Sequence, residues 1–135
     1  MAKFVLTDAS LVINSVDLSD HVASVTLELN SEEIDTTAFG STFMSKTGGL
    51  KSGTLSIDFQ ADFASSEVDQ TMFPLFGSTT TFVLKPTSGS VSATNPSYSG
   101  SILVNQHIPV ANAVGELATM SVSFPTSGTI TRATS

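Results

Sequence analysis

Val25-Thr26-Leu27-Glu28-Leu29 is the stretch that decides the fold, together with its later counterpart Leu55-Ser56-Ile57-Asp58-Phe59. Apolar and polar residues alternate in both runs, and successive side chains on a strand point to opposite faces of a sheet. One face therefore collects the apolar members, Val25, Leu27, Leu29, Leu55, Ile57 and Phe59. The other face collects Thr26, Glu28, Ser56, Asp58 and Gln60. We predict two strands of one sheet, with an apolar back and an acidic, solvated front.

The segment between the two runs, residues 30–53, is polar, contains glycine and is too long for a tight turn. Structureless loops of this length are uncommon unless they have a function, so we predict a protruding arm. Residues 32–37 either extend the first strand or form a ribbon of their own, and Gly48-Gly49 is expected to break the chain.

Two phenylalanines and a methionine lie in this arm without a periodic partner: Phe39, Phe43 and Met44. One interpretation is an apolar patch that another subunit covers. The other, of equal weight, is that these side chains fold back onto the core of their own chain.

The composition indicates one domain over residues 1–135, of the all-β class. With 135 residues, 40% of them apolar, the chain can bury a core. Charged residues make up only 13%, and most of the polar residues are the 40 serines and threonines. Threonine favours strands, while serine and glycine favour turns. The lack of cysteine favours the cytosol, and we expect neither a signal peptide nor a membrane span.

The net charge of −7 is unevenly placed along the chain. Residues 1–70 hold eleven of the twelve acids and three of the five bases, which gives −8, and residues 71–135 give +1. Such a chain does not bind nucleic acid by neutralising phosphates, because that needs clustered lysine and arginine. It can still enclose DNA, since a wall of like charge repels phosphates. The alternative is that the acids only maintain solubility.

Periodicity and turn residues predict the remaining strands. They are expected over residues 3–7, 11–14, 23–29, 53–59, 78–85, 98–108 and 117–124. Pro125 should close the last of these, which leaves residues 126–135 as a C-terminal tail with a short strand at 129–131.

One short amphipathic helix is predicted over residues 67–76 and should pack on the apolar back of the sheet. Ser65 or Ser66 would cap its start, and the apolar residues Val68, Met72, Leu75 and Phe76 follow at helical spacing. Pro74 should end or kink the helix near Phe73.

The front of the predicted sheet is unusual in its uniformity. Residues 117–124 add Thr119, Ser121 and Ser123 to the polar side chains of the two long strands, and none of these is lysine or arginine. One solvated face is ordinary in an antiparallel sheet. A smooth surface of short hydroxyl and carboxylate side chains suits the wall of a channel.

Five fragments, in order, carry a resemblance that covers essentially the whole chain. They are residues 18–22 (Leu-Ser-Asp-His-Val), 33–40 (Glu-Ile-Asp-Thr-Thr-Ala-Phe-Gly), 49–53 (Gly-Leu-Lys-Ser-Gly), 95–100 (Asn-Pro-Ser-Tyr-Ser-Gly) and 115–119 (Gly-Glu-Leu-Ala-Thr), the last followed by Phe124-Pro125 and by 128–132 (Gly-Thr-Ile-Thr-Arg). With this ordered set of fragments, the sequence resembles the major tail tube protein of long-tailed (siphovirus-type) bacteriophages, particularly those infecting actinobacteria.

The resemblance implies an all-β subunit, a β-sandwich of tail-tube type with one short helix. Such subunits form hexameric rings that stack into a hollow tail, with four strands per subunit joining into a continuous β-barrel. The lumen is commonly acidic, so that genomic DNA slides through it without specific binding. Lumen-lining candidates on this chain are Thr26, Glu28, Ser56, Asp58, Thr119 and Ser121. Residues 30–53 would be the inter-subunit arm, with contacts from Thr36, Phe39, Gly40, Phe43, Met44, Gly48 and Gly49.

The resemblance also implies partners and location. The chain would bind copies of itself and other tail proteins such as the tape measure, tail terminator and distal tail proteins, with no cofactor and no membrane. It would assemble in the host bacterial cytoplasm and reside in the virion tail. The tube subunit of a contractile tail or injection system is a related alternative.

Two other classes of function fit the sequence less well. An enzyme would need a catalytic constellation, yet the two histidines, His21 and His107, lie far apart and no Gly-x-Ser-x-Gly turn is present. Asp17, Asp20 and His21 are interpreted as turn and cap residues rather than as a metal site. An immunoglobulin-like adhesive surface module shares the strand count, but the missing cysteine pair and the arm argue against it.

Overall fold

A computed structural model describes residues 7–65, 67–110 and 112–135 of the chain. Its strands are β1 (Ser10–Ile13), β2 (Val16–Asp17), β3 (Val22–Asp35), β4 (Lys46–Gln60), β5 (Thr79–Lys85), β6 (Ser97–Leu103) and β7 (Thr119–Ala133). One α-helix, α1 (Val68–Met72), and two 3₁₀ turns, Ser19–His21 and Phe73–Leu75, complete the described elements. The prediction of an all-β fold with one short helix is confirmed.

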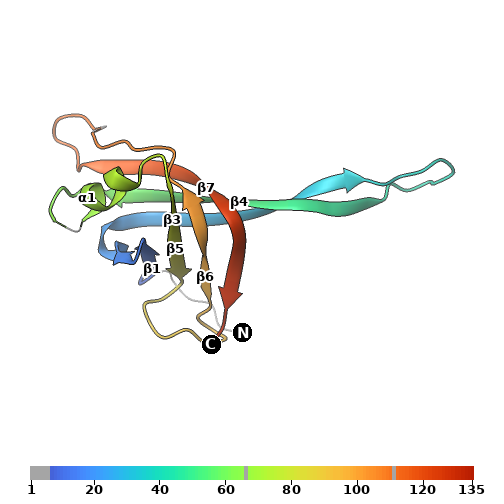
Figure 1. Cartoon of the computed structure of the whole chain (residues 1–135), viewed down its shortest axis with the longest axis horizontal. Coiled ribbons are helices and arrows are strands. Elements are labelled where there is room, and N and C mark those ends of the chain that lie inside the picture. Colours follow the sequence, from blue (N-terminus) through green and yellow to red (C-terminus); the bar gives the residue numbers. More distant parts are fainter. Residues whose placement is uncertain (1–6, 66, 111) are drawn as a thin grey trace.

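The strands form one antiparallel sheet in the order β2-β1-β5-β6-β7-β4-β3, which folds over into two layers. Figure 1 shows β3, β4 and the first part of β7 side by side, while β1, β5 and β6 cross them. Strand β7 belongs to both layers, because it pairs with β4 over its first half and with β6 over its second. A strand that bends from one layer into the other is the usual corner of an orthogonal packing.

The predicted pairing of the two alternating runs is confirmed. Val25 lies opposite Ile57 and Leu27 opposite Leu55, so the apolar side chains share one face. Leu55, Ile57 and Phe59 are fully buried in one core with Met120, Val122 and Phe124 of β7, and Phe82 and Ile102 reach it from the other layer. Val25 and Leu27 pack against its border, while Leu29, where the arm begins, is exposed.

Strand β7 is longer than predicted, because Pro125 does not close it. The strand continues to Ala133, so residues 126–133 pair with β6 and are not a loose tail. The N–H groups of Thr119 and Ser123 bond to side chains rather than to β4. Pro125 has the same strand parity, so its nitrogen also points away from β4, and the missing donor costs no hydrogen bond to β4. Gly128, with φ of +90°, then supplies backbone freedom at the bend.

Strand β6 is shorter than predicted and ends at Leu103 instead of near Ile108. In the register that pairs Ile102 with Thr126, the next residue along β6 would face Pro125, which has no N–H to donate. The chain turns away at this point, and the N–H of Val104 donates to the carbonyl of Ser78 at 2.9 Å.

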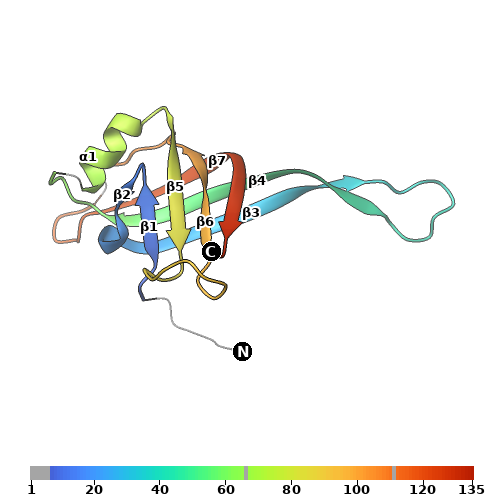
Figure 2. The same ribbon diagram turned by 60° about the horizontal axis from the view of Figure 1, so that its bottom comes forward.

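The arm is a two-stranded ribbon that extends the sheet well beyond the sandwich (Figure 2). Strand β3 runs on to Asp35 and β4 begins at Lys46, which confirms the interpretation that the segment extends the strand over residues 32–35, whereas Thr36 and Thr37 lie beyond the strand end. The expected break at Gly48-Gly49 is wrong, since both glycines lie within β4. A Cβ atom on Gly49 would come within 2.8 Å of the Ile34 side chain, so the glycine lets side chains of β3 cross the ribbon.

Helix α1 is confirmed near its predicted place, with different ends. The α-helix stops at Met72 and continues as the 3₁₀ turn that contains Pro74, as the proline predicts. Its N-cap is Glu67, without a side-chain cap bond, so Ser65 does not cap it, and Ser66 lies outside the described residues. Val68 and Met72 join the core, while Phe76 is exposed.

The strand expected over residues 3–7 lies outside the described part of the chain, except for Thr7, which is in no strand. None of the helices in the described residues has the length and apolarity needed to cross a membrane.

Candidate functional site

The predicted front of the sheet forms a continuous polar face on β3, β4 and the first half of β7. The register places Thr26 opposite Ser56 and Ser56 opposite Ser123, so three hydroxyls form one row across the sheet. The next row along the sheet contains Ser24, Asp58 and Ser121. All six lumen candidates lie on this face: Thr26, Glu28, Asp58 and Ser121 are exposed, and Ser56 and Thr119 are partly exposed.

Short hydrogen bonds tie this polar face together. The Ser24 hydroxyl donates to Asp58 Oδ2 at 2.6 Å, and the Ser56 and Ser123 hydroxyl oxygens lie 3.0 Å apart. Hydrogen bonds from Ser24, and secondarily from Ser121, lower the pKa of the Asp58 carboxyl. Asp58 is therefore ionised at neutral pH. None of the described strand residues that share this face is a lysine or arginine.

The face extends beyond the six predicted candidates. Ser24, Thr54 and Ser123 have the same strand parity, and the alternation pattern already contained the signal for them. Asn30 donates from Nδ2 to Glu28 Oε1 at 2.9 Å and continues the face into the arm. Three described strands carry it, whereas the resemblance implies four per subunit.

Within the described part of the chain, both sides of this three-strand layer are open edges. Strand β3 pairs only with β4 among the described strands and is the last in the sheet order. On the opposite side, residues 119–124 of β7 pair with β4 alone among the described strands, because β6 joins β7 further along. An unpaired strand edge presents N–H and C=O groups that can pair with another chain.

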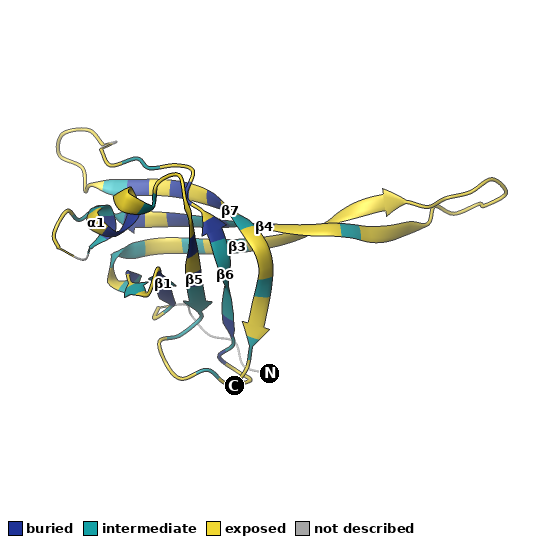
Figure 3. Ribbon diagram, viewed as in Figure 1, coloured by how far each residue is buried: buried dark blue, intermediate teal, exposed yellow. Residues whose placement is uncertain are grey.

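The arm tip carries apolar side chains that contact no core. Phe39 and Phe43 have relative exposures of 108% and 86%, and Met44 of 67%, so the interpretation that they fold back onto their own chain is wrong. Figure 3 shows the ribbon almost wholly exposed, in contrast to the sandwich. Exposed aromatic and methionine side chains are typical of surfaces that bind another protein.

Hydrogen bonds between its two strands close the ribbon just before this tip. The N–H of Thr36 donates to the Ser45 carbonyl at 2.9 Å, their hydroxyl oxygens lie 2.8 Å apart, and the N–H of Ser45 donates to Thr37 Oγ1 at 2.8 Å. Gly40, with φ of +89°, lies in the terminal turn. Lower in the ribbon, Lys46 forms an ion pair with Glu33. The arm therefore holds its apolar tip away from the sandwich.

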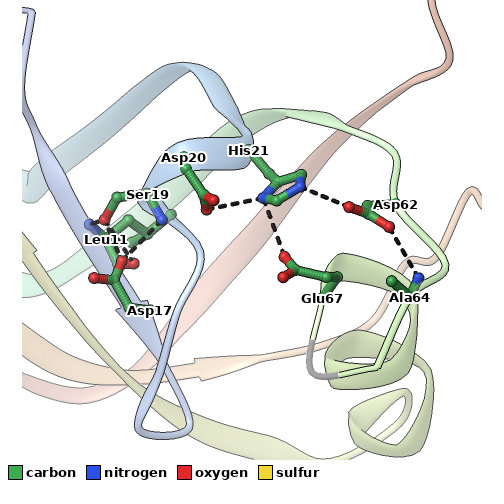
Figure 4. A network of polar contacts seen from close by, with 8 residues as sticks. All are labelled: Leu11, Asp17, Ser19, Asp20, His21, Asp62, Ala64 and Glu67. Atoms are coloured by element: carbon green, nitrogen blue, oxygen red, sulfur yellow. Dashed lines mark hydrogen bonds and ion pairs between the residues drawn. The ribbon is translucent and has the colours of Figure 1, made fainter.

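A cluster of carboxylates surrounds His21 at the end of the sandwich opposite the arm (Figure 4). The Nδ1 atom lies 2.8 Å from Asp20 and 3.2 Å from Glu67, and Nε2 lies 2.8 Å from Asp62. Asp20, His21 and Glu67 each offer an atom of the kind that binds metals, all within 4.8 Å of one another. Both ring nitrogens already face carboxylates, which is the arrangement of an ion-paired histidinium that fastens the start of β3 to the segment before α1.

We expect this cluster to stabilise the fold more at mildly acidic than at alkaline pH. The Asp20 carboxylate, followed by Asp62 and Glu67, raises the pKa of His21 despite its burial. A raised folded-state pKa gives stability that is complete below the unfolded value of about 6.5 and is lost as pH rises through the folded value.

The free energies of unfolding of wild type and of His21→Gln should therefore differ most at about pH 5.5 and least at about pH 8.5. Urea titrations at both pH values measure this difference. A constant difference would show that the imidazole acts without its charge. Asp17→Asn, which removes a carboxylate outside the cluster, is the control.

Comparisons with known proteins place the fold. No family model and no curated protein matches the chain significantly. Among solved structures, the chain is similar to one in the virion of a native gene transfer agent particle, with a TM-score of 0.74, 16% identity and 93% and 95% of the two chains covered. It is also similar to a chain in the tail of an empty gene transfer agent particle with C6 symmetry, with a TM-score of 0.67, 16% identity and 82% and 81% covered. These likenesses establish a shared fold.

Proposed function

We propose that the chain is the structural subunit of a phage-like tail tube. Copies would join side by side into six-membered rings, with the β3-β4-β7 face towards a central bore, and the rings would stack through the arm. The tube would act as the conduit for genomic DNA during ejection. The observation that carries this proposal is the polar face, which has no lysine or arginine among its described residues and is bounded on both sides by edges that pair with no described strand.

Edge pairing explains why such edges are present. A single chain with a long exposed edge strand is prone to uncontrolled association. The two edges of the layer differ from one another, so their contact is heterologous, and a heterologous contact closes into a ring when its rotation allows. The rings would together form the continuous β-barrel that the resemblance implies.

The two ends of the long axis support stacking. Figure 1 shows the arm tip at one end of the subunit, and α1 with the loop before β7 at the other. Phe39 and Phe43 are exposed in the tip, and Phe73, Val114 and Leu117 are exposed in the segments just after α1 and just before β7. Apolar patches at both ends of an elongated subunit are what a head-to-tail array would cover. The solved structures that share the fold belong to a virion and to a tail with C6 symmetry, which supports the same reading.

The bore would be lined by Glu28 and Asp58 among hydroxyl side chains. Carboxylates repel phosphates within about 8–10 Å at physiological salt, a range that matters in a narrow channel. DNA would therefore pass without specific binding. The tape measure, tail terminator and distal tail proteins would be further partners, the virion tail would be the location, and the host cytoplasm the place of assembly. As the related alternative, the tube subunit of a contractile tail or injection system would use the same face and arm.

Electron microscopy of the purified protein tests this proposal. Concentrated wild-type protein should show rings of six copies, or tubes of stacked rings, in negative stain. Image averaging should place β3 and β4 at the bore. A protein that stays monomeric at every concentration, or tubes with this face on the outside, would overturn it.

A further inference from the structure

Among the residues that the structure describes, two side chains and no strand cover the free edge of β7. We propose that Gln106 and Asn112 accept the hydrogen bonds of this edge before assembly, and that strand β3 of a second copy replaces them when subunits join. The inference rests on the proposed function, because the partner is another copy of the chain. It goes beyond the proposed function by naming the two strand edges that pair and the side chains that cover one of them before assembly.

Two outward N–H groups of β7 show this cover directly. The N–H of Thr119 donates to Asn112 Oδ1 at 2.8 Å, and Asn112 Nδ2 donates in return to Thr119 Oγ1 at 3.1 Å. The N–H of Ser123 donates to Gln106 Oε1 at 3.2 Å. Thr119 and Ser123 share one strand parity, so both N–H groups point to the side away from β4. The two amide side chains thus accept hydrogen bonds from N–H groups that would otherwise donate to a neighbouring strand.

The backbone leaves this edge open for a specific reason. Strand β6 stops opposite the proline of β7, and Val104 then bonds to the segment before β5 in two directions: its N–H donates to Ser78, and Gly77 donates to its carbonyl at 2.7 Å. The chain that follows passes close enough for its side chains to reach β7, but no described backbone pairs there. Hydrogen bonds from exposed side chains compete with water and exchange readily, unlike a strand ladder.

Strand β3 of another copy fits this edge in direction and character. Both β3 and β7 are antiparallel to β4, so they run parallel to one another. Copies related by a rotation would therefore bring β3 alongside β7 as a parallel pair. The outer edge of β3 has no pairing strand in the described residues, and Thr26 and Glu28 would continue the polar face across the junction.

The test removes the two covering side chains. The double variant Gln106→Ala, Asn112→Ala should form tubes at a concentration about tenfold lower than wild type, the factor expected from losing two exposed hydrogen bonds. Asn105→Ala is the matched control, because Asn105 is exposed and has no described side-chain hydrogen bond. Equal thermal unfolding of all three proteins as monomers verifies that the variants fold.

Hydrogen exchange of the Thr119 and Ser123 amides separates the possible outcomes. Both amides should exchange about tenfold faster in the monomeric double variant than in wild type, and should become protected in tubes of either protein. Tubes in which the variant amides stay unprotected, or an unchanged assembly concentration, would overturn the inference and leave the proposed function standing. If neither protein assembles, the proposed function fails as well.

Discussion

Replacing residues 39–44 with Asn-Gly is expected to leave a folded protein that forms no tubes. The tip contacts none of the described core residues, and the hydrogen bonds between Thr36, Thr37 and Ser45 remain to close the ribbon around a short turn. Burying Phe39 or Phe43 in a neighbour would contribute about 2 kcal/mol each, and the deletion removes this at every contact between rings. Sedimentation and negative-stain microscopy should find subunits or rings without stacks, with unchanged thermal unfolding.

A matched variant separates the apolar side chains from the length of the tip. Ser41→Ala, Thr42→Ala alters the same loop and keeps Phe39, Phe43 and Met44, so it should assemble like wild type. Assembly of the shortened protein into normal tubes would show that the arm has no part in stacking.

Reversing the charge of the polar face is expected to make the tube retain DNA. The change Glu28→Lys, Asp58→Lys brings the net charge from −7 to −3 and places two cations per subunit where no described side chain of the face is basic. Both residues are exposed, so folding and assembly should persist. Lysines attract phosphates and release counterions, so DNA should co-sediment with the variant tubes at low salt and dissociate as salt rises.

The control for this variant makes the same change of charge elsewhere. Asp8→Lys, Glu116→Lys alters the net charge equally at two loop residues outside the three-strand face. It should bind far less DNA inside the tube. Equal DNA retention by both variants, or unchanged passage of DNA through the reversed face, would show that Glu28 and Asp58 do not face the bore.

The sequence by itself determined the three-strand layer and its two faces. Alternation in residues 25–29 and 55–59 is a local property, because strand geometry sends neighbouring side chains to opposite sides whatever the rest of the chain does. The same alternation placed Thr119 and Ser121 on the polar face, and the proline in the helical stretch placed the end of α1 near Met72.

Only the tertiary structure decided the features that depend on which chain lies beside a residue. Pro125 predicts a strand end from sequence, yet it is tolerated because its nitrogen points away from β4, to an edge where no described strand pairs. Two of the three carboxylates around His21, those of Asp62 and Glu67, come from a segment distant in sequence, and the amide cover of β7 comes from the connection before that strand; neither has a periodic signal. Periodicity records the face to which a side chain points, whereas neighbours across a sheet edge are set by how the whole sheet folds over.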